Sequence, residues 1–137
     1  MARKETKTMK RKGFTLIELL VVIAIIGILA SIVLVSLGTA RNKAKDVAIK
    51  ADLSGLRSAA ELFAADNGDA YTGFCTETGG DYSRVAASVP TAICDDDADV
   101  WAVCAPLIAV PDDYFCVDSN GTAKQITGTC ASITVCP

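Results

Sequence analysis

The feature that most constrains this 137-residue chain is residues 19–37, a run of 19 residues without a charge. As a helix this run would rise ~28 Å, close to the ~30 Å hydrocarbon core of a bilayer. Only Gly27, Ser31 and Ser36 within it are not apolar, and all three are small, which lets neighbouring helices approach closely. The run therefore predicts a membrane-spanning helix.

The charges on the two sides of this run differ in sign. Residues 1–13 hold six basic residues and one acidic residue, whereas the rest of the chain holds seven basic and fifteen acidic residues. Lys and Arg are enriched on the cytoplasmic side of membrane helices. We therefore expect residues 1–12 in the cytoplasm and the C-terminal part outside.

The composition excludes several classes of function. The chain has no histidine, so Ser-His, Cys-His and His-metal sites are excluded. Its acidic body also lacks the clustered Lys and Arg that a nucleic-acid groove needs. We expect neither an enzyme nor a direct nucleic-acid partner.

Three interpretations of the N-terminus compete. It could be a cleaved secretory signal, with small residues for cleavage at Gly38-Thr39-Ala40, or a plain single-pass anchor. Neither gives Glu18 a role, although a carboxylate at the start of a membrane helix is costly unless it finds a partner. In the third interpretation the chain begins at Phe14, and Glu18 pairs with a free α-amino group.

Residues 12–30 resemble the N-terminus of type IV prepilins and the related pseudopilins. The shared pattern is a basic leader, Gly13 at the cleavage site, Phe14 next, Glu18 as the fifth residue after the cut, and then an apolar helix. The resemblance covers about residues 10–60. It implies the pilin fold, an α+β fold in which a long N-terminal helix packs on a small C-terminal antiparallel sheet.

The resemblance also implies roles for individual residues. A prepilin peptidase would cut between Gly13 and Phe14 and methylate the new amine of Phe14. Glu18 would pair with the Phe14 amine of an adjacent subunit during assembly of a helical filament on a platform driven by an ATPase. The leader would be held at the inner membrane by three basic residues: Lys10, Arg11 and Lys12.

Residues 39–66 predict a continuation of the same helix, since they are rich in helix formers. Apolar side chains recur at steps of three and four residues, at Ile49, Leu53, Leu56, Ala60 and Phe63. This spacing predicts one apolar stripe, and Asn67-Gly68 predicts the helix end. We expect one helix over residues 15–66, ~78 Å long, with its stripe against the C-terminal sheet.

Residues 67–137 predict a small disulfide-rich domain with a sheet of about three strands. Residues 100–104 and 114–117 are typical of strands, and Ser119-Asn120-Gly121 before residues 122–126 predicts a tight hairpin. The expected organisation is a cleaved leader over 1–13, an assembly helix over 14–38, its amphipathic continuation over 39–66, and the β domain over 67–137.

The six cysteines indicate up to three disulfides formed in an oxidising compartment, and their spacings contain no CxxC pair. Six cysteines allow fifteen pairings. We favour a Cys75–Cys94 bond, a Cys104–Cys116 bond across a hairpin, and a Cys130–Cys136 bond in the tail. In a rival pairing, Cys136 is bonded to a cysteine of the sheet. A bond from Cys104 to any cysteine other than Cys116 would exclude the expected hairpin.

Two acidic runs, residues 95–99 and Asp112-Asp113, suggest a calcium site, because calcium takes six to eight oxygen ligands. The EF-hand spacing is absent, however, and charge runs are usually solvated loops. No other cofactor is expected. The aromatic residues are expected in the core and sheet: Tyr71, Phe74, Tyr82, Trp101, Tyr114 and Phe115.

The sequence therefore predicts a structural subunit of a type IV pilus, inserted in the membrane as a precursor and then assembled into an extracellular filament. In the family, such fibres serve adhesion, twitching motility or DNA uptake. One alternative is a pseudopilin of a type II secretion system, which shares the N-terminus. Another is a membrane-anchored, disulfide-rich extracellular binding domain, which would not polymerise.

Overall fold

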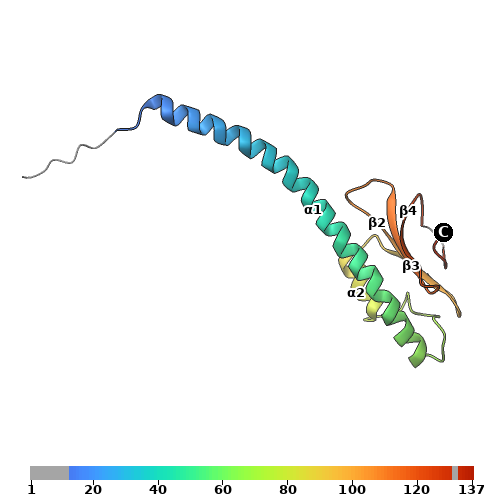
Figure 1. Cartoon of the computed structure of the whole chain (residues 1–137). Helices are drawn as coiled ribbons and strands as arrows, with labels where there is room; N and C mark the ends of the chain where they lie inside the picture. The colour runs from blue at the N-terminus through green and yellow to red at the C-terminus, as the bar shows by residue number, and fades with distance from the viewer. Residues whose placement is uncertain (1–12, 131–132) are drawn as a thin grey trace, which may run out of the picture. The chain divides into compact units, whose positions relative to one another are not determined.

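The computed structural model describes residues 13–130 and 133–137. Its elements in chain order are α1 (Leu16–Asp66), α2 (Asp81–Ser88), β1 (Ile93–Asp96), β2 (Trp101–Pro106), β3 (Asp113–Asp118) and β4 (Ala123–Thr127) (Figure 1). The chain forms two compact units, Met1–Gly38 and Thr39–Pro137, and α1 contributes to both. A long N-terminal helix with a small antiparallel sheet confirms the expected α+β pilin fold.

Helix α1 follows the predicted pattern closely in the second unit. Ile49, Leu53, Leu56 and Ala60 are buried there, while Phe63 is half-buried. The helix ends at Asp66, where the backbone N–H groups of Asn67 and Asp69 both donate to the Ala64 carbonyl. Gly68 then adopts a φ of 75°, a left-handed conformation that favours glycine at a helix C-terminus.

The four strands form a sheet in the order β1-β2-β3-β4, and every neighbouring pair is antiparallel. The predicted turn joins β3 to β4, with Gly121 at a φ of 88°. Strand β1 and helix α2 were not expected. Both are short: β1 is Ile93-Cys94-Asp95-Asp96, and none of the eight residues of α2 is buried.

The central strands β2 and β3 bury side chains on both faces of the sheet. On one face Trp101, Val103 and Val117 pack with Leu53 and Leu56 of α1. The other face holds four cysteines, with further apolar contacts from Tyr114, Ile126 and Ile133: Cys104, Cys116, Cys130 and Cys136. Figure 1 shows α1 on one side of the sheet and the C-terminal end on the other. The tail therefore supplies the second cover that the central strands need.

The disulfides agree with the expected pairing at one bond and differ at two. Cys75 joins Cys94, as expected. Cys104 joins Cys130 and Cys116 joins Cys136, so the expected Cys104–Cys116 and Cys130–Cys136 bonds are wrong. Cys104 and Cys116 do lie opposite each other in the β2–β3 register. The hairpin thus coexists with a bond from Cys104 to the tail, because the tail crosses the face to which both side chains point.

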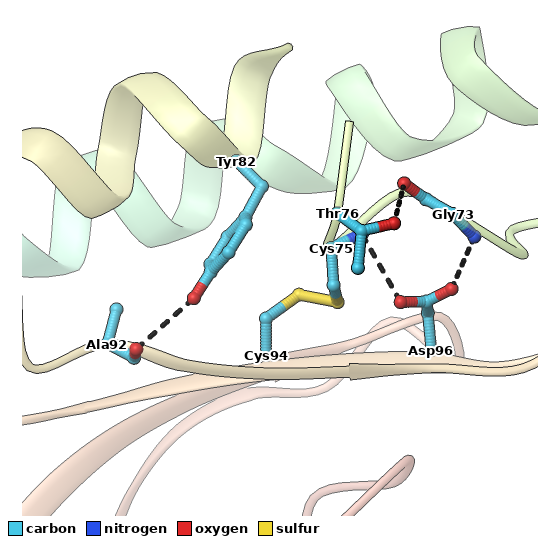
Figure 2. The surroundings of a disulfide bond; sticks show 7 residues. All are labelled: Gly73, Cys75, Thr76, Tyr82, Ala92, Cys94 and Asp96. Atoms are coloured by element: carbon cyan, nitrogen blue, oxygen red, sulfur yellow. Dashed lines mark hydrogen bonds between the residues drawn. A yellow bond between two sulfur atoms is a disulfide. The ribbon is translucent and has the colours of Figure 1, made fainter. Parts of the chain in front are cut away.

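The Cys75–Cys94 bond ties the loop after α1 to strand β1 (Figure 2). Beside it, the Asp96 carboxylate accepts hydrogen bonds from the backbone N–H groups of Gly73 at 2.6 Å and Cys75 at 3.3 Å. On the other side of the bond, the Tyr82 hydroxyl of α2 donates to the Ala92 carbonyl at 3.2 Å. These contacts fix a loop that has little regular structure of its own.

Two further carboxylates anchor loops in the same way. Buried Asp46 of α1 accepts backbone hydrogen bonds from Ile108 at 2.6 Å and Ala109 at 3.0 Å, which holds the β2–β3 connection. Buried Asp118 accepts them from Thr122 at 2.8 Å and Cys136 at 2.9 Å. Each carboxylate thereby satisfies two backbone donors that would otherwise lack partners.

Candidate processing and assembly site

The candidate site is the start of α1, where Gly13, Phe14 and Thr15 precede the first helical residue. The Glu18 carboxylate oxygen Oε2 accepts hydrogen bonds from the Thr15 backbone N–H at 2.9 Å and from the Thr15 hydroxyl at 2.8 Å. The Glu18 backbone N–H in turn donates to the Thr15 hydroxyl at 3.3 Å. This reciprocal arrangement is a capping box.

The capping box follows from the physical needs of a helix N-terminus. The first backbone N–H groups of a helix have no intrahelical acceptor, and a threonine at the N-cap satisfies one of them. A carboxylate in the first turn also interacts favourably with the helix dipole. The Thr15-x-x-Glu18 spacing is visible in the sequence. The interpretation that Glu18 has no role in a plain anchor was therefore wrong.

The carboxylate of Glu18 nevertheless keeps capacity for a further partner. Both of its hydrogen bonds use Oε2, and an ionised carboxylate offers acceptor sites on both oxygens. Within residues 13–130 and 133–137, Oε1 accepts no hydrogen bond, and Glu18 is exposed. The side chain can cap its own helix and accept a cation at the same time.

The residues on either side of the expected cleavage point are exposed. A Cβ built on Gly13 would have nothing within 4 Å, and its φ is not in the left-handed region. The fold therefore places no demand for glycine at this position. Phe14 is 83% exposed. The expected leader residues Lys10, Arg11 and Lys12 lie outside the described part of the chain.

Within the part of the chain that the structure describes, the apolar half of α1 packs against no hydrophobic core. Among the described residues, α1 is the one helix that is long and apolar enough to cross a membrane, and its most apolar stretch has no buried residue. The Ser31 hydroxyl inside this stretch donates to the Ile28 carbonyl at 2.7 Å, so its polarity is satisfied within the helix. The N-terminal motif and this apolar helix fit a membrane-anchored precursor that becomes an extracellular filament.

Three of the six aspartates in the two acidic runs, Asp96, Asp97 and Asp113, accept internal hydrogen bonds. Asp95 and Asp96 lie in β1, and Asp97 accepts from the Ala98 backbone N–H at 2.7 Å. Asp113 accepts from Gln125 and Thr127. Among the described residues, no group of three or more metal-ligating side chains could hold a metal ion. The described residues therefore offer no cluster of ligands for the calcium site that the sequence suggests.

The chain shares its N-terminus with a known family. Residues 8–34 match the Prokaryotic N-terminal methylation motif. The type IV wide pilus major component PilA4 of Thermus thermophilus is 48% identical over 61 residues, which is 44% of this chain and 46% of that protein. The type II secretion system core protein G of Escherichia coli is 42% identical over 60 residues, 44% of this chain and 41% of that protein.

A third relative matches most of this chain. The type IV major pilin protein PilA of Myxococcus xanthus is 31% identical over 125 residues, which is 86% of this chain and 56% of that protein. The chain thus spans about half the length of the curated relatives it matches. No solved structure matches the chain. The chain thus carries the prokaryotic N-terminal methylation motif and is similar both to type IV pilins and to the pseudopilins of type II secretion systems.

Proposed function

We propose that the chain is the structural subunit of a type IV pilus. It enters the cytoplasmic membrane as a precursor, loses residues 1–13 to a prepilin peptidase, receives a methyl group on the Phe14 amine, and polymerises through α1. The organisation into leader, assembly helix, amphipathic continuation and β domain belongs to this proposal. So do the leader's basic residues, the assembly platform and its ATPase. The subunit itself catalyses no reaction.

One observation carries the proposal: an exposed Gly13-Phe14 bond lies just before a capped helix whose apolar half contains no buried residue. The apolar surface needs a bilayer before assembly and other copies of the helix after it. Cleavage would place a new amine at Phe14, within one helical turn of Glu18. The free Oε1 of Glu18 is then available to the Phe14 amine of an adjacent subunit.

The test of processing is intact-mass and N-terminal mass spectrometry on protein from the native membrane and surface fractions. The proposal expects a chain that begins at N-methylated Phe14 and is lighter by two hydrogens for each of the three disulfides. A chain that begins after Ala40 would identify the apolar run as a discarded secretory signal. A chain that retains Met1 in the surface fraction would contradict pilin-type processing.

The test of assembly is the Glu18→Gln variant. Glutamine also completes a capping box at this position, so the variant keeps the helix start and removes only the charge. We expect normal cleavage with loss of surface fibres, seen by electron microscopy. Thr15→Ser is the matched control, because serine keeps the capping hydroxyl. Fibres from Glu18→Gln in normal number would exclude the proposed charge pairing.

The second candidate is a type II secretion pseudopilin, favoured by the 42% identity to a core protein G. We place it second because that match covers 44% of this chain, whereas the match to a major pilin covers 86%. Long surface fibres under native expression support the pilus. Short periplasmic assemblies, together with a thermal shift caused by calcium and reversed by a chelator, would support the pseudopilin.

A further inference from the structure

Three basic residues follow the apolar half of α1, and we call Arg41, Lys43 and Lys45 the basic collar. All three side chains are exposed. No acidic residue occurs between Glu18 and Asp46. The collar is therefore a local excess of three positive charges on a chain whose body is acidic.

The described residues of the protein do not neutralise the collar. Within the described ranges, none of the three side chains forms an ion pair or a hydrogen bond. Asp46 is the nearest carboxylate in sequence, but it is buried and bound to the backbone N–H groups of Ile108 and Ala109. Lys50, the next basic residue, does have partners: its Nζ donates to Gln125 at 2.9 Å and lies over the Phe115 ring.

Along α1 the collar begins at the outer edge of the lipid headgroup layer and extends a few ångströms beyond it. Its members lie four to eight residues beyond Leu37, the last large apolar residue before the collar, which is ~6–12 Å of helical rise. The polar layer on each side of a bilayer is ~5–7 Å thick. Long Lys and Arg side chains can also reach back along a helix towards the phosphates.

The spacing of the collar suits a surrounding lipid layer better than one protein partner. Its members are two residues apart, so successive side chains point about 200° apart around the helix axis. Basic residues are also normally depleted on the non-cytoplasmic side of a membrane helix, where the collar lies. Their presence there calls for an anion that is available on all sides of the helix.

We propose that the basic collar binds the phosphate groups of anionic lipids on the outer face of the cytoplasmic membrane. The contacts would fix how deeply the precursor sits in the bilayer before it is drawn into a filament. This inference rests on membrane insertion and not on fibre formation. Lipid binding can therefore be measured on protein that forms no fibre.

The test uses the full-length chain in mild detergent with equal amounts of phosphatidylglycerol and phosphatidylcholine, and native mass spectrometry to count the lipids that remain bound. One variant replaces the collar with glutamine: Arg41→Gln, Lys43→Gln and Lys45→Gln. The matched control removes the same charge elsewhere on the second unit: Arg57→Gln, Arg84→Gln and Lys124→Gln. The leader's basic residues are present in every sample, so the contribution of the collar is read as the difference in lipid retention between the collar variant and the control.

The expected result is that the wild type and the control retain phosphatidylglycerol over phosphatidylcholine by more than about tenfold, since each basic residue near a surface attracts anionic lipid. The collar variant should retain clearly less phosphatidylglycerol than the control, and the preference that remains should come from the leader's basic residues. Equal lipid retention by the collar variant and the control would overturn the proposal. So would a wild type that shows no preference, whether or not the chain forms fibres in cells.

Discussion

At the scale of single residues, a few carboxylates determine how this chain is held together. Glu18 caps α1, while Asp46, Asp96 and Asp118 each accept two backbone hydrogen bonds from loops. The sequence pattern alone predicts a role in assembly for Glu18 and a solvated acidic run that contains Asp96. Both residues have structural roles within the monomer that depend on specific N–H donors.

Replacing Thr15 with valine should weaken the start of α1. Valine keeps the side-chain shape but lacks the hydroxyl that contacts Glu18, and loss of an N-cap costs about 1 kcal/mol. We expect amides of the first helical turn to exchange about fivefold faster, measured by hydrogen exchange of the full-length chain in detergent. Thr15→Ser should exchange like the wild type. Unchanged exchange in Thr15→Val would show that the capping box does not stabilise the helix start.

Replacing Asp118 with asparagine should destabilise the β domain by about 2 kcal/mol, because an amide group then faces a buried backbone N–H that has lost its acceptor. A domain of this size loses about 4–8 °C of Tm for each 1 kcal/mol. Thermal unfolding under non-reducing conditions measures the change. Asp97→Asn is the control, since Asp97 is exposed and bonds only its neighbour Ala98. Equal Tm values for the two variants would contradict the anchoring role of Asp118.

At the scale of elements, the second half of α1 is stabilised by one apolar face. Leu53 is fully buried against the sheet, while Leu62 on the same helix is 63% exposed. This contrast follows from the spacing of apolar residues, because every third or fourth side chain returns to the same face. Leu53 and Leu62 can therefore be compared as a buried and an exposed leucine on the same helix.

Leu53→Ala should lower the free energy of unfolding by about 2–5 kcal/mol, since it removes buried surface and leaves a cavity. Leu62→Ala should change it by less than about 0.5 kcal/mol, as is usual for exposed positions. Denaturant unfolding with the disulfides intact measures both values. Similar losses in the two variants would mean that the stripe does not form the core face of α1.

Helix α2 is held by few contacts, and Tyr82 supplies one of them. Burial raises the pKa of Tyr82 above the ordinary tyrosine value. Above a pH of about 10 the unfolded chain loses this proton more readily than the folded chain. The stability contribution is therefore complete below that pH and is lost as pH rises towards the folded-state pKa.

The corresponding measurement is the free energy of unfolding of the wild type and Tyr82→Phe between pH 8 and about 10.5. The wild type should lose stability more steeply at the upper end, because phenylalanine has no proton to lose. All six cysteines are in disulfides, so no free thiolate complicates the comparison. Parallel curves would exclude Tyr82 as a source of the pH dependence.

At the scale of the whole molecule, the β domain is a small sheet covered on one face by α1 and on the other by the tail. The tail contributes few apolar side chains, so two disulfides hold it in place. Small domains commonly need such bonds because their cores are limited. We therefore expect each disulfide to protect mainly the segment that it ties to the sheet.

Removing the Cys116–Cys136 bond with alanine at both positions should cost about 3 kcal/mol, the value expected for a loop of this length. The double alanine variant at Cys75 and Cys94 removes a bond that closes a loop of similar length and should cost a similar amount. Only the first variant should expose the tail to limited proteolysis, read by mass spectrometry. Tail cleavage to the same extent in both variants would contradict the cover that we assign to the tail.

The sequence by itself determined the membrane-length apolar run, the start and end of α1, its buried stripe, and the hairpin at Gly121. Each of these depends on residues close together in the chain, where charge, spacing or glycine conformation decides the outcome locally. Only the tertiary structure decided the partners of Cys104 and Cys116, the existence of β1 and α2, and the anchoring carboxylates. Those features join segments that are far apart in sequence, such as Asp46 and Ile108, and no local pattern encodes which distant groups will meet.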